Sequence, residues 1–279
     1  MGLAGRRIRQ ATNPMNLSEF KTATDRPLAG RVALVTGGAK RVGRAVALRL
    51  AREGMDVAIT YHTSPRDADV AVEQVSALGR RAQAIQVDLS QAGAADHVYD
   101  RFAACFDRLD VLVNNASSFV ASPLAHVTPA GFQHHMAINA LAPLMLIQKF
   151  AALLSAGSGG NAGSPPDAGR VVNLVDAHVM GGPLKRFSVY NASKAALVAI
   201  TKTCALELAP KVTVNAVAPG VVAWPESFSV QQRDRCLSRV PLGRVGSPDD
   251  VAGAVVFLVR DAHYCTGQVI PVDGGRSLV

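Results

Sequence analysis

From Arg31 to its last residue, the chain alternates short apolar segments with segments of helical length, and this alternation constrains the fold more than any other feature. The apolar segments are residues 31–37, 55–62, 81–90, 109–117, 169–177, 211–220 and 267–275. Near-continuous strands of Val, Ile and Ala between helices are typical of a parallel sheet covered on both faces. The pattern predicts an α/β fold in which one domain holds a doubly wound parallel sheet flanked by helices on both faces.

Composition divides the chain into a tail and a domain with two unusual loops. Residues 1–27 contain arginines but no apolar stretch after them, which argues against a secretory signal and predicts a disordered N-terminal tail. The domain spans residues 28–279. Within it, residues 155–169 are rich in Gly, Ser and Pro, which predicts a mobile insertion. Residues 221–246 look irregular, hold the only tryptophan and follow a strand end, which predicts a substrate loop.

The bulk composition narrows the classes of function. The 4 cysteines are far apart and form no CxxC pair, so we expect neither a metal site nor a disulfide framework. No apolar run approaches the roughly 20 residues of a membrane span, and we expect a cytoplasmic protein without a membrane partner. The net charge of +8 suits nucleic acid and anionic small molecules alike. Because the basic residues are scattered, we expect a small-molecule substrate and no nucleic acid.

A glycine-containing turn, "VTGGAKRVGRA" at residues 35–45, joins the first predicted strand to the first predicted helix. Gly37 and Gly43 would let the backbone turn sharply and let a phosphate approach the helix N-terminus. There, free N–H groups and the helix dipole favour anions. Because the motif lies between a strand and a helix, it predicts a dinucleotide site.

The end of the second predicted strand, "TYHTS" at residues 60–64, indicates which dinucleotide binds. A carboxylate at this position would bind a ribose 2′-hydroxyl and repel a 2′-phosphate, but no acid occurs before Asp67. Polar and basic side chains could instead gather near the 2′-phosphate: Lys40, Arg41, His62, Ser64 and Arg66. The sequence therefore predicts NADPH as the cofactor.

The segment "YNASK" places Tyr190 and Lys194 one helical turn apart on the same face. A nearby ammonium stabilises phenolate, so we expect Lys194 to lower the pKa of Tyr190 towards the range of a working proton donor. Lys194 could also hydrogen-bond the nicotinamide ribose. Such sites usually place a hydroxyl at the end of the preceding strand, where this chain has Asp176.

Together with "NNAS" (114–117), Asn139, "APG" (218–220) and "VDGG" (272–275), these motifs resemble the short-chain dehydrogenase/reductase family from about Leu28 to Val279. The resemblance implies a Rossmann-type fold, a homotetramer and catalytic roles for Asn139, Tyr190 and Lys194. The serine of the family's catalytic set is missing, and Asp176 takes its place. An ionised carboxylate would oppose the negative charge that grows on a reduced carbonyl oxygen, but it suits a protonated C=N bond.

Within this family, the pteridine reductases carry the same replacement. The chain is similar to them in "TGGAKRVG" (36–43), "YHTS" (61–64), "NNASSF" (114–119), "VDA" (175–177) and "VDGGRSL" (272–278). The similarity implies that Phe119 stacks on the pterin. The substrate-binding residues would be Arg41, Ser117, Phe119, Asp176 and Tyr190. The cofactor-binding residues would be Gly37, Lys40, Arg41, Val42, Gly43, His62, Thr63, Ser64, Asp88, Leu89, Asn115, Ala116, Ser117, Tyr190, Lys194 and Gly220.

Three departures from the pteridine reductases affect these expectations. The interval from Asp176 to Tyr190 is one residue longer than is typical of them, which could move the acid. Thr63 stands where an arginine is common, and Val222 replaces a polar residue that can touch the cofactor. The departures leave the expected cofactor class unchanged and bear on the choice of substrate.

We therefore expect an NADPH-dependent pteridine reductase that converts a dihydropterin of the biopterin, monapterin or folate type into the tetrahydropterin. A carbonyl or 3-oxoacyl reductase of the same fold is the alternative, in which Ser188 near Tyr190 would replace the missing hydroxyl. A protein that binds NADP(H) as a non-catalytic sensor is a further alternative, although a sensor does not need a tuned phenol.

Overall fold

The computed structural model of the chain describes residues 27–156, 168–222, 224 and 229–279. Most of the predicted tail (1–26), much of the predicted insertion (157–167) and residues 223 and 225–228 of the predicted substrate loop lie outside these ranges.

The described strands form one parallel sheet of seven strands in the order β3-β2-β1-β4-β5-β6-β7. The direction of the order reverses between β1 and β4, and open parallel sheets bind their ligands at such a switch point. All the expected strand segments form strands, which confirms the prediction. Their bounds are β1 (Val32–Val35), β2 (Asp56–Tyr61), β3 (Ala82–Gln86), β4 (Val111–Asn114), β5 (Gly169–Leu174), β6 (Val212–Pro219) and β7 (Val269–Val272).

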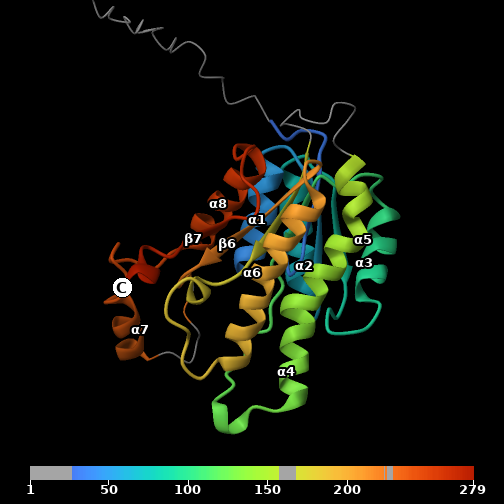
Figure 1. The fold of residues 1–279 in the computed structure, drawn as a ribbon. Coiled ribbons are helices and arrows are strands. Elements are labelled where there is room, and N and C mark those ends of the chain that lie inside the picture. The colour runs from blue at the N-terminus through green and yellow to red at the C-terminus, as the bar shows by residue number, and fades with distance from the viewer. Residues whose placement is uncertain (1–26, 157–167, 223, 225–228) are drawn as a thin grey trace, which may run out of the picture.

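Helices cover both faces of the sheet, as Figure 1 shows. One core contains the inner sides of α1 (Arg41–Arg52), α2 (Pro65–Ala77) and α8 (Pro248–Arg260). The other contains those of α3 (Ala94–Ala103), α5 (Ala142–Ala156) and α6 (Ser188–Leu208), while α4 (Pro129–Met136) leads into α5. In β1, Ala33 and Val35 belong to the first core, and Val32 and Leu34 belong to the second. This alternation is the two-residue period of a strand buried on both faces.

The predicted substrate loop is not wholly irregular, because it contains α7 (Val230–Leu237), which lies apart from the two helical layers in Figure 1. The hydrophobic pattern of this segment is weak, and none of its described residues is buried. Because α7 does not pack into a core, its sequence lacks the periodic apolar pattern from which a helix could be predicted.

One helical stretch, Pro129–Ala156, is 28 residues long, and an 18-residue window within it has a mean hydropathy of 1.6, so its length and composition would allow it to cross a membrane. The expectation that no segment reaches this length and hydropathy is therefore wrong. The stretch joins α4, a π-helical turn η3 (Ala137–Leu141) and α5. Leu146, Phe150 and Leu154 pack into the core between α5 and the sheet. Such burial is typical of a core helix in a water-soluble α/β fold.

The turn between β1 and α1 places the helix against the end of β4. Gly37 has a φ of +62°, in the left-handed region that favours glycine. A Cβ on Gly43 would lie 2.2 Å from the carbonyl oxygen of Gly37 and 2.6 Å from Nδ2 of Asn115. Only glycine at position 43 therefore allows this close approach.

Replacement of Gly43 by alanine should lower the free energy of unfolding by about 1–3 kcal/mol, because the added methyl group overpacks the turn. Gly253 in the neighbouring helix α8 provides a matched control, since a Cβ there meets no atom within 4 Å. Gly253→Ala should raise the free energy of unfolding by about 0.5–1 kcal/mol through helix propensity. Urea unfolding of both variants tests the comparison, and equal effects would show that the turn tolerates a side chain.

Candidate active site

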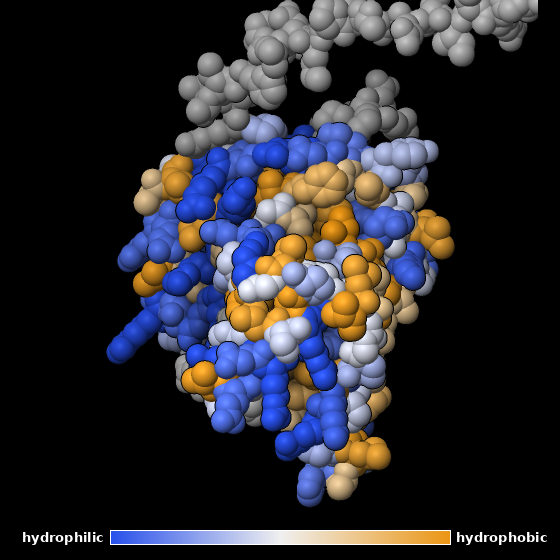
Figure 2. All heavy atoms as spheres, turned by 90° about the vertical axis from the view of Figure 1, so that its left-hand side faces the viewer, coloured by the Kyte–Doolittle hydropathy of each residue, from blue (hydrophilic) through white to orange (hydrophobic). Residues whose placement is uncertain are grey.

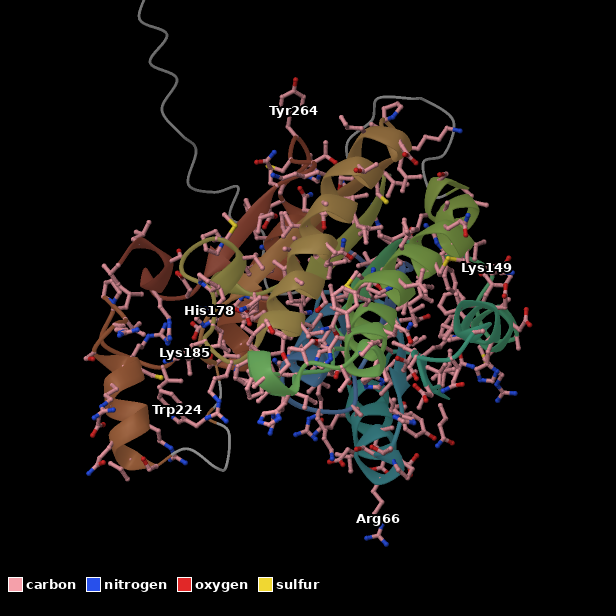
Figure 3. The ribbon with its side chains drawn as sticks, turned by 60° about the horizontal axis from the view of Figure 1, so that its bottom comes forward. Arg66, Lys149, His178, Lys185, Trp224 and Tyr264 are labelled. Atoms are coloured by element: carbon pink, nitrogen blue, oxygen red, sulfur yellow. The ribbon has the colours of Figure 1, made fainter. Side chains whose placement is uncertain are left out.

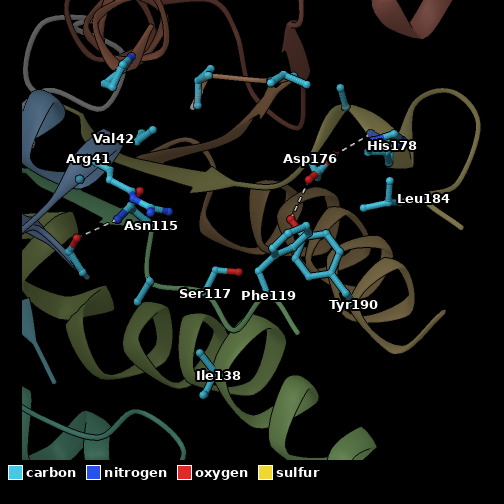
Figure 4. A pocket seen from close by; sticks show the side chains of 18 of the residues that line it. Arg41, Val42, Asn115, Ser117, Phe119, Ile138, Asp176, His178, Leu184 and Tyr190 are labelled. Atoms are coloured by element: carbon cyan, nitrogen blue, oxygen red, sulfur yellow. Dashed lines mark hydrogen bonds between the residues drawn. The ribbon is translucent and has the colours of Figure 1, made fainter. Parts of the chain in front are cut away.

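A cavity of about 960 Å³ opens at the carboxyl ends of the strands. It lies beside the β1–α1 turn, the ends of β2, β4, β5 and β6, the region of α7 and the C-terminal turn (Figure 4). Most of the predicted site residues line it together: Gly37, Lys40, Arg41, Val42, Gly43, His62, Asp88, Leu89, Asn115, Ala116, Ser117, Phe119, Asp176, Tyr190 and Gly220. Thr63 and Ser64 do not line it, and Asn139 and Lys194 lie buried behind its wall.

The N-terminus of α1 faces this cavity and suits an anionic group. The first N–H groups of a helix have no acceptor within the helix. Lys40, at the N-cap, makes no capping hydrogen bond through its side chain, and the first turn contains no acidic residue. The positive end of the helix dipole is therefore not neutralised locally, which favours binding of a phosphate.

Arg41 begins α1 with a φ of +48°, which an L-residue adopts at a cost of about 1–2 kcal/mol. The chain therefore keeps a cation at the helix N-terminus in a backbone conformation that would suit glycine better.

The basic residues near β2 are only partly arranged as predicted. His62 lines the cavity, but Lys40 pairs with Asp67 at 2.9 Å between Nζ and Oδ2. Arg66 does not line the cavity, and its side chain points away from the protein in Figure 3. The prediction that Arg66 contributes to the 2′-phosphate site is not supported by this geometry, because the first turn of α2 directs it to solvent.

The ends of β1 and β4 are joined by the hydroxyl of Thr36. Its Oγ1 accepts hydrogen bonds from the backbone N–H groups of Asn115 and Ala116, at 2.9 and 3.0 Å. The side-chain amide of Asn115 in turn donates to the carbonyl oxygens of Thr36 and Gly37 at 2.9 and 3.1 Å. These contacts fix the cavity wall that follows β4 against the glycine turn.

Beyond β3, Asp88 lies at the other side of the glycine turn. Its Oδ1 accepts hydrogen bonds from the hydroxyl and the backbone N–H of Ser90, at 2.7 and 2.9 Å. These hydrogen bonds lower the pKa of Asp88 to about 2, so the side chain is ionised at neutral pH.

The carboxylate of Asp176 accepts two hydrogen bonds at the end of β5. Its Oδ2 accepts one from the hydroxyl of Tyr190 at 2.7 Å, and its Oδ1 accepts one from the backbone N–H of His178 at 2.9 Å (Figure 4). The second bond caps the short 3-10 helix η5 (Ala177–Val179). The extra residue before Tyr190 therefore does not remove the acid from the phenol.

The expected lowering of the pKa of Tyr190 is wrong for this arrangement. Burial raises the pKa of Tyr190 far above its ordinary value, and the charge of Asp176 and their hydrogen bond raise it further. The Nζ of Lys194 lies 6.0 Å from the centre of the Tyr190 ring and donates to the carbonyl oxygen of Leu174 at 2.7 Å. Burial lowers the pKa of Lys194 to about 8.

Asn139 lies in the π-helical turn, and each of its hydrogen-bonding groups has a partner. Its Oδ1 accepts from the N–H of Ser118 at 2.8 Å and from the hydroxyl of Ser117 at 3.2 Å. Its Nδ2 donates to the carbonyl oxygen of Ser118 at 3.0 Å and to Oγ of Ser193 at 2.9 Å. Ser193 then donates to the carbonyl oxygen of Tyr190 at 2.8 Å. The side chain of Asn139 therefore positions the Tyr190 helix relative to the wall at Ser117.

Phe119 lies beside the phenol. Its ring stacks on Phe187 with centres 4.6 Å apart and meets the ring of Tyr190 edge-on at 4.8 Å. About half of its surface is exposed, at 49%. An aromatic ring that is fixed on one face and exposed elsewhere can hold a flat ligand, and stacking on a pterin stays a prediction.

Neither Ser188 nor Ser277 replaces the missing serine. Ser188 donates to the carbonyl oxygen of Ser122 at 3.0 Å and does not line the cavity. Ser277 lines the cavity, but its backbone N–H and its side chain are bound to Asp273. The substitute that the ketone reductase alternative would use is therefore absent from this arrangement.

Sequence reasoning missed three groups of residues at this site. Ser193 lies inside "YNASK", so its spacing from Tyr190 could have drawn attention to it. Thr36 follows β1 directly, where a buried hydroxyl can reach the next strand. No pattern indicated that the C-terminal turn η6 (Arg276–Leu278) reaches the cavity.

Comparison with known proteins identifies the family. A family profile described as "Enoyl-(Acyl carrier protein) reductase" matches residues 37–277. A 3-oxoacyl-[acyl-carrier-protein] reductase of Synechocystis sp. is 36% identical over 264 residues, which cover 90% of this chain and 98% of that protein. An uncharacterized oxidoreductase of Methylorubrum extorquens is 36% identical over 255 residues, which cover 89% and 98%.

Solved structures agree with this assignment. The blue fluorescent protein from a metagenomic library, solved in complex with NADPH, has a TM-score of 0.80 and 34% identity, and the match covers 90% of this chain and 99% of that one. The angucycline C-6 ketoreductase LanV, solved with bound NADP, has a TM-score of 0.82 and 29% identity, with coverage of 91% and 98%. The chain therefore belongs to the short-chain dehydrogenase/reductase family of oxidoreductases.

Proposed function

We propose that this protein is an NADPH-dependent pteridine reductase, which adds hydride to a C=N bond of a dihydropterin and yields the tetrahydropterin. The hydrogen bond between Asp176 and Tyr190, with no hydroxyl in the serine's place, carries this proposal. The pterin substrate, the homotetramer and the cytoplasmic location stay predictions.

The choice of NADPH rests on the fit of the cavity to a dinucleotide and on the two neighbours solved with NADPH and NADP. The uncapped N-terminus of α1 would hold the diphosphate, and Arg41 and His62 would bind the 2′-phosphate. Lys40 could join them only by leaving Asp67. When bound, NADPH supplies the hydride.

The charge at Asp176 argues against a ketone as the preferred substrate. A ketone oxygen needs a proton donor, but the hydroxyl of Tyr190 already donates to Asp176. Loss of that proton would place two negative charges within one short hydrogen bond in a buried site, and the raised pKa of Tyr190 expresses this cost. Tyr190 is therefore a poor proton donor while Asp176 is ionised.

The same charge favours a substrate that carries a positive charge beside the acid. The unused lone pair of Oδ2 in Asp176 can accept a hydrogen bond from the N–H group of a protonated ring nitrogen. Hydride forms a C–H bond at the adjacent carbon, the C=N double bond becomes a C–N single bond, and its π electrons return to the nitrogen, which becomes a neutral amine. The proton enters from solvent, carried to the ring nitrogen by the carboxyl group of Asp176, and Tyr190 orients that group.

Reduction of a carbonyl or 3-oxoacyl group is the second candidate, and the names of the relatives favour it. The Synechocystis relative is a 3-oxoacyl reductase, and LanV is a ketoreductase. Turnover of 7,8-dihydrobiopterin and acetoacetyl thioester with NADPH separates the two candidates. We expect the larger kcat/KM with the dihydropterin, and faster reduction of the thioester would reject our proposal.

Replacement of Asp176 by serine should lower kcat/KM for the dihydropterin by about 100-fold or more and raise it for the thioester, because a hydroxyl replaces a charge. Asp176→Asn is the matched control, since it keeps the shape and can still cap η5 without the charge. It should also slow dihydropterin reduction but give no gain on the thioester. Steady-state kinetics measure both, and unchanged dihydropterin kinetics in Asp176→Ser would show that the acid is not involved.

The pKa of Lys194 predicts a falling limb in the pH profile. In the free enzyme the ammonium should lose its proton at about pH 8, because burial disfavours the charged form. As the pH rises through this value, attraction to the anionic cofactor weakens, and kcat/KM for NADPH should fall. Lys194→Arg keeps its charge over this range and should abolish the limb at a lower overall rate. A wild-type limb above pH 9.5 would contradict the assignment.

Two variants of Arg41 separate its charge from its backbone strain. Arg41→Ala and Arg41→Gly should weaken NADPH binding by the same factor, about 10-fold, because both remove one charge-assisted contact. Only Arg41→Gly should raise the free energy of unfolding, by about 1 kcal/mol, since glycine relieves the positive φ. Fluorescence titration and urea unfolding provide the measurements, and equal stability of the two variants would argue against strain.

A further inference from the structure

The guanidinium group of Arg276 has a buried N–H donor without an acceptor at the wall of the cavity. Arg276 begins the C-terminal turn η6 and lines the cavity. Its Nη1 is buried and has no hydrogen-bond partner among the described residues. An arginine does not lose its proton in a protein, so this N–H group remains a charged donor that needs an acceptor.

The neighbouring carboxylate of Asp273 does not supply that acceptor. Its two oxygens accept hydrogen bonds from the backbone N–H groups of Gly275 and Ser277, at 2.9 and 2.7 Å. These bonds fix the turn and thereby hold Arg276 at the cavity wall. Asp273 makes no ion pair with Arg276 among the described contacts.

Two further cations, Lys185 and Arg239, line the same cavity, and neither has an ion pair with a described residue. The segments that carry these cations are packed together. Gly181 lies against Ser277, and Gly275 lies against Pro241, two residues after Arg239. His178, Lys185 and Trp224 also line the cavity.

Acidic side chains are scarce at this end, where Val279 with its terminal carboxylate also lines the cavity. Among the described lining residues, the acidic side chains are Asp88, which lies beyond β3 near the glycine turn, and Asp176. Figure 2 faces the side that bears α7 and the C-terminal turn, and hydrophilic side chains surround a more apolar centre on this face. The cavity thus has one end lined by the cations Arg276, Lys185 and Arg239. This end lies on the opposite side of Asp176 from the N-terminus of α1.

We propose that Arg276, with Lys185 and Arg239 around it, forms a subsite for an anionic group that the substrate carries away from its reacting C=N bond. The group is a carboxylate or a phosphate ester, because either presents oxygen acceptors to a guanidinium fork. The inference rests on the proposed reduction of a pterin, and it narrows the substrate class to pterins with an acidic substituent.

Binding can be measured without turnover, because Trp224 is the only tryptophan and lines the cavity. Its fluorescence would be titrated in the presence of NADP⁺ with 6-(2-carboxyethyl)pterin, with 6-hydroxymethylpterin phosphate and with neutral 6-hydroxymethylpterin, since the side chain holds each anionic group away from the ring. We expect an anionic pterin to bind about 10- to 100-fold more tightly than the neutral one. The stronger of the two anions identifies the group, and equal binding of all three pterins would overturn the proposal.

Arg276→Met should remove the preference for the anionic pterin and change binding of the neutral pterin by less than about threefold. Arg276→Lys should keep part of the preference, which tests charge separately from shape. Arg235→Met is the matched control, since Arg235 is exposed in α7 and does not line the cavity, and it should leave the preference intact. If Arg276→Met weakens both pterins equally, or Arg235→Met removes the preference, the subsite is not at Arg276.

The same variants distinguish this inference from the proposed function. If no dihydropterin is reduced but anionic pterins bind more tightly and Arg276→Met removes that preference, the reaction is wrong and the subsite stands. If dihydropterins are reduced at equal kcat/KM with and without an acidic substituent, the reaction stands and the subsite is wrong.

Discussion

The carboxyl edge of the sheet depends on hydrogen bonds between buried polar side chains of neighbouring strands. Asn114 of β4 donates to Asn173 of β5 at 2.8 Å, and Asn173 donates to Thr201 of α6 at 2.9 Å. Thr36 joins the end of β1 to the segment after β4. In a buried setting each of these groups is costly to leave unpaired, so the network specifies how the strand ends align. Residues far apart in the sequence, such as Gly37, Ser117 and Asp176, reach one cavity because the strand ends are aligned.

On this frame, a single charge determines what the phenol can do. In a site where a hydroxyl lies beside the catalytic tyrosine, both groups can donate hydrogen bonds to a substrate oxygen that becomes negative. Here Asp176 accepts the hydrogen of Tyr190 and keeps the phenol neutral, so the pair presents a negative charge to the substrate. Under the proposed function, the chain keeps the fold and the cofactor site of its family while the preferred charge of the substrate reverses.

Sequence reasoning predicted the sheet, because strands buried on both faces give continuous apolar runs that differ clearly from helices. It also predicted most of the cavity wall, since Gly37, Ser117, Asp176 and Gly220 each follow a strand and parallel strands end at one edge. It failed where a side chain has alternative partners. Helical spacing places Lys194 near Tyr190, but only the structure shows its Nζ turned to the carbonyl oxygen of Leu174. It likewise could not place Arg276, because the approach of η6 to the cavity depends on packing between distant segments.

The names of the relatives favour a ketone substrate, whereas the chemistry of the site favours the proposed pterin. The names reflect similarity over the whole chain, and the chemistry reflects a few side chains. The identity of 36% to a 3-oxoacyl reductase is an average over 90% of the chain. Substrate choice depends on a few side chains beyond Asp176, and these contribute little to an overall identity. Arg41 illustrates the same principle at the cofactor end, because it keeps a cation where its φ of +48° would suit glycine. A charged residue in a position that its local conformation disfavours is not selected by the fold. Such residues are therefore the best basis for inferring the substrate and the cofactor.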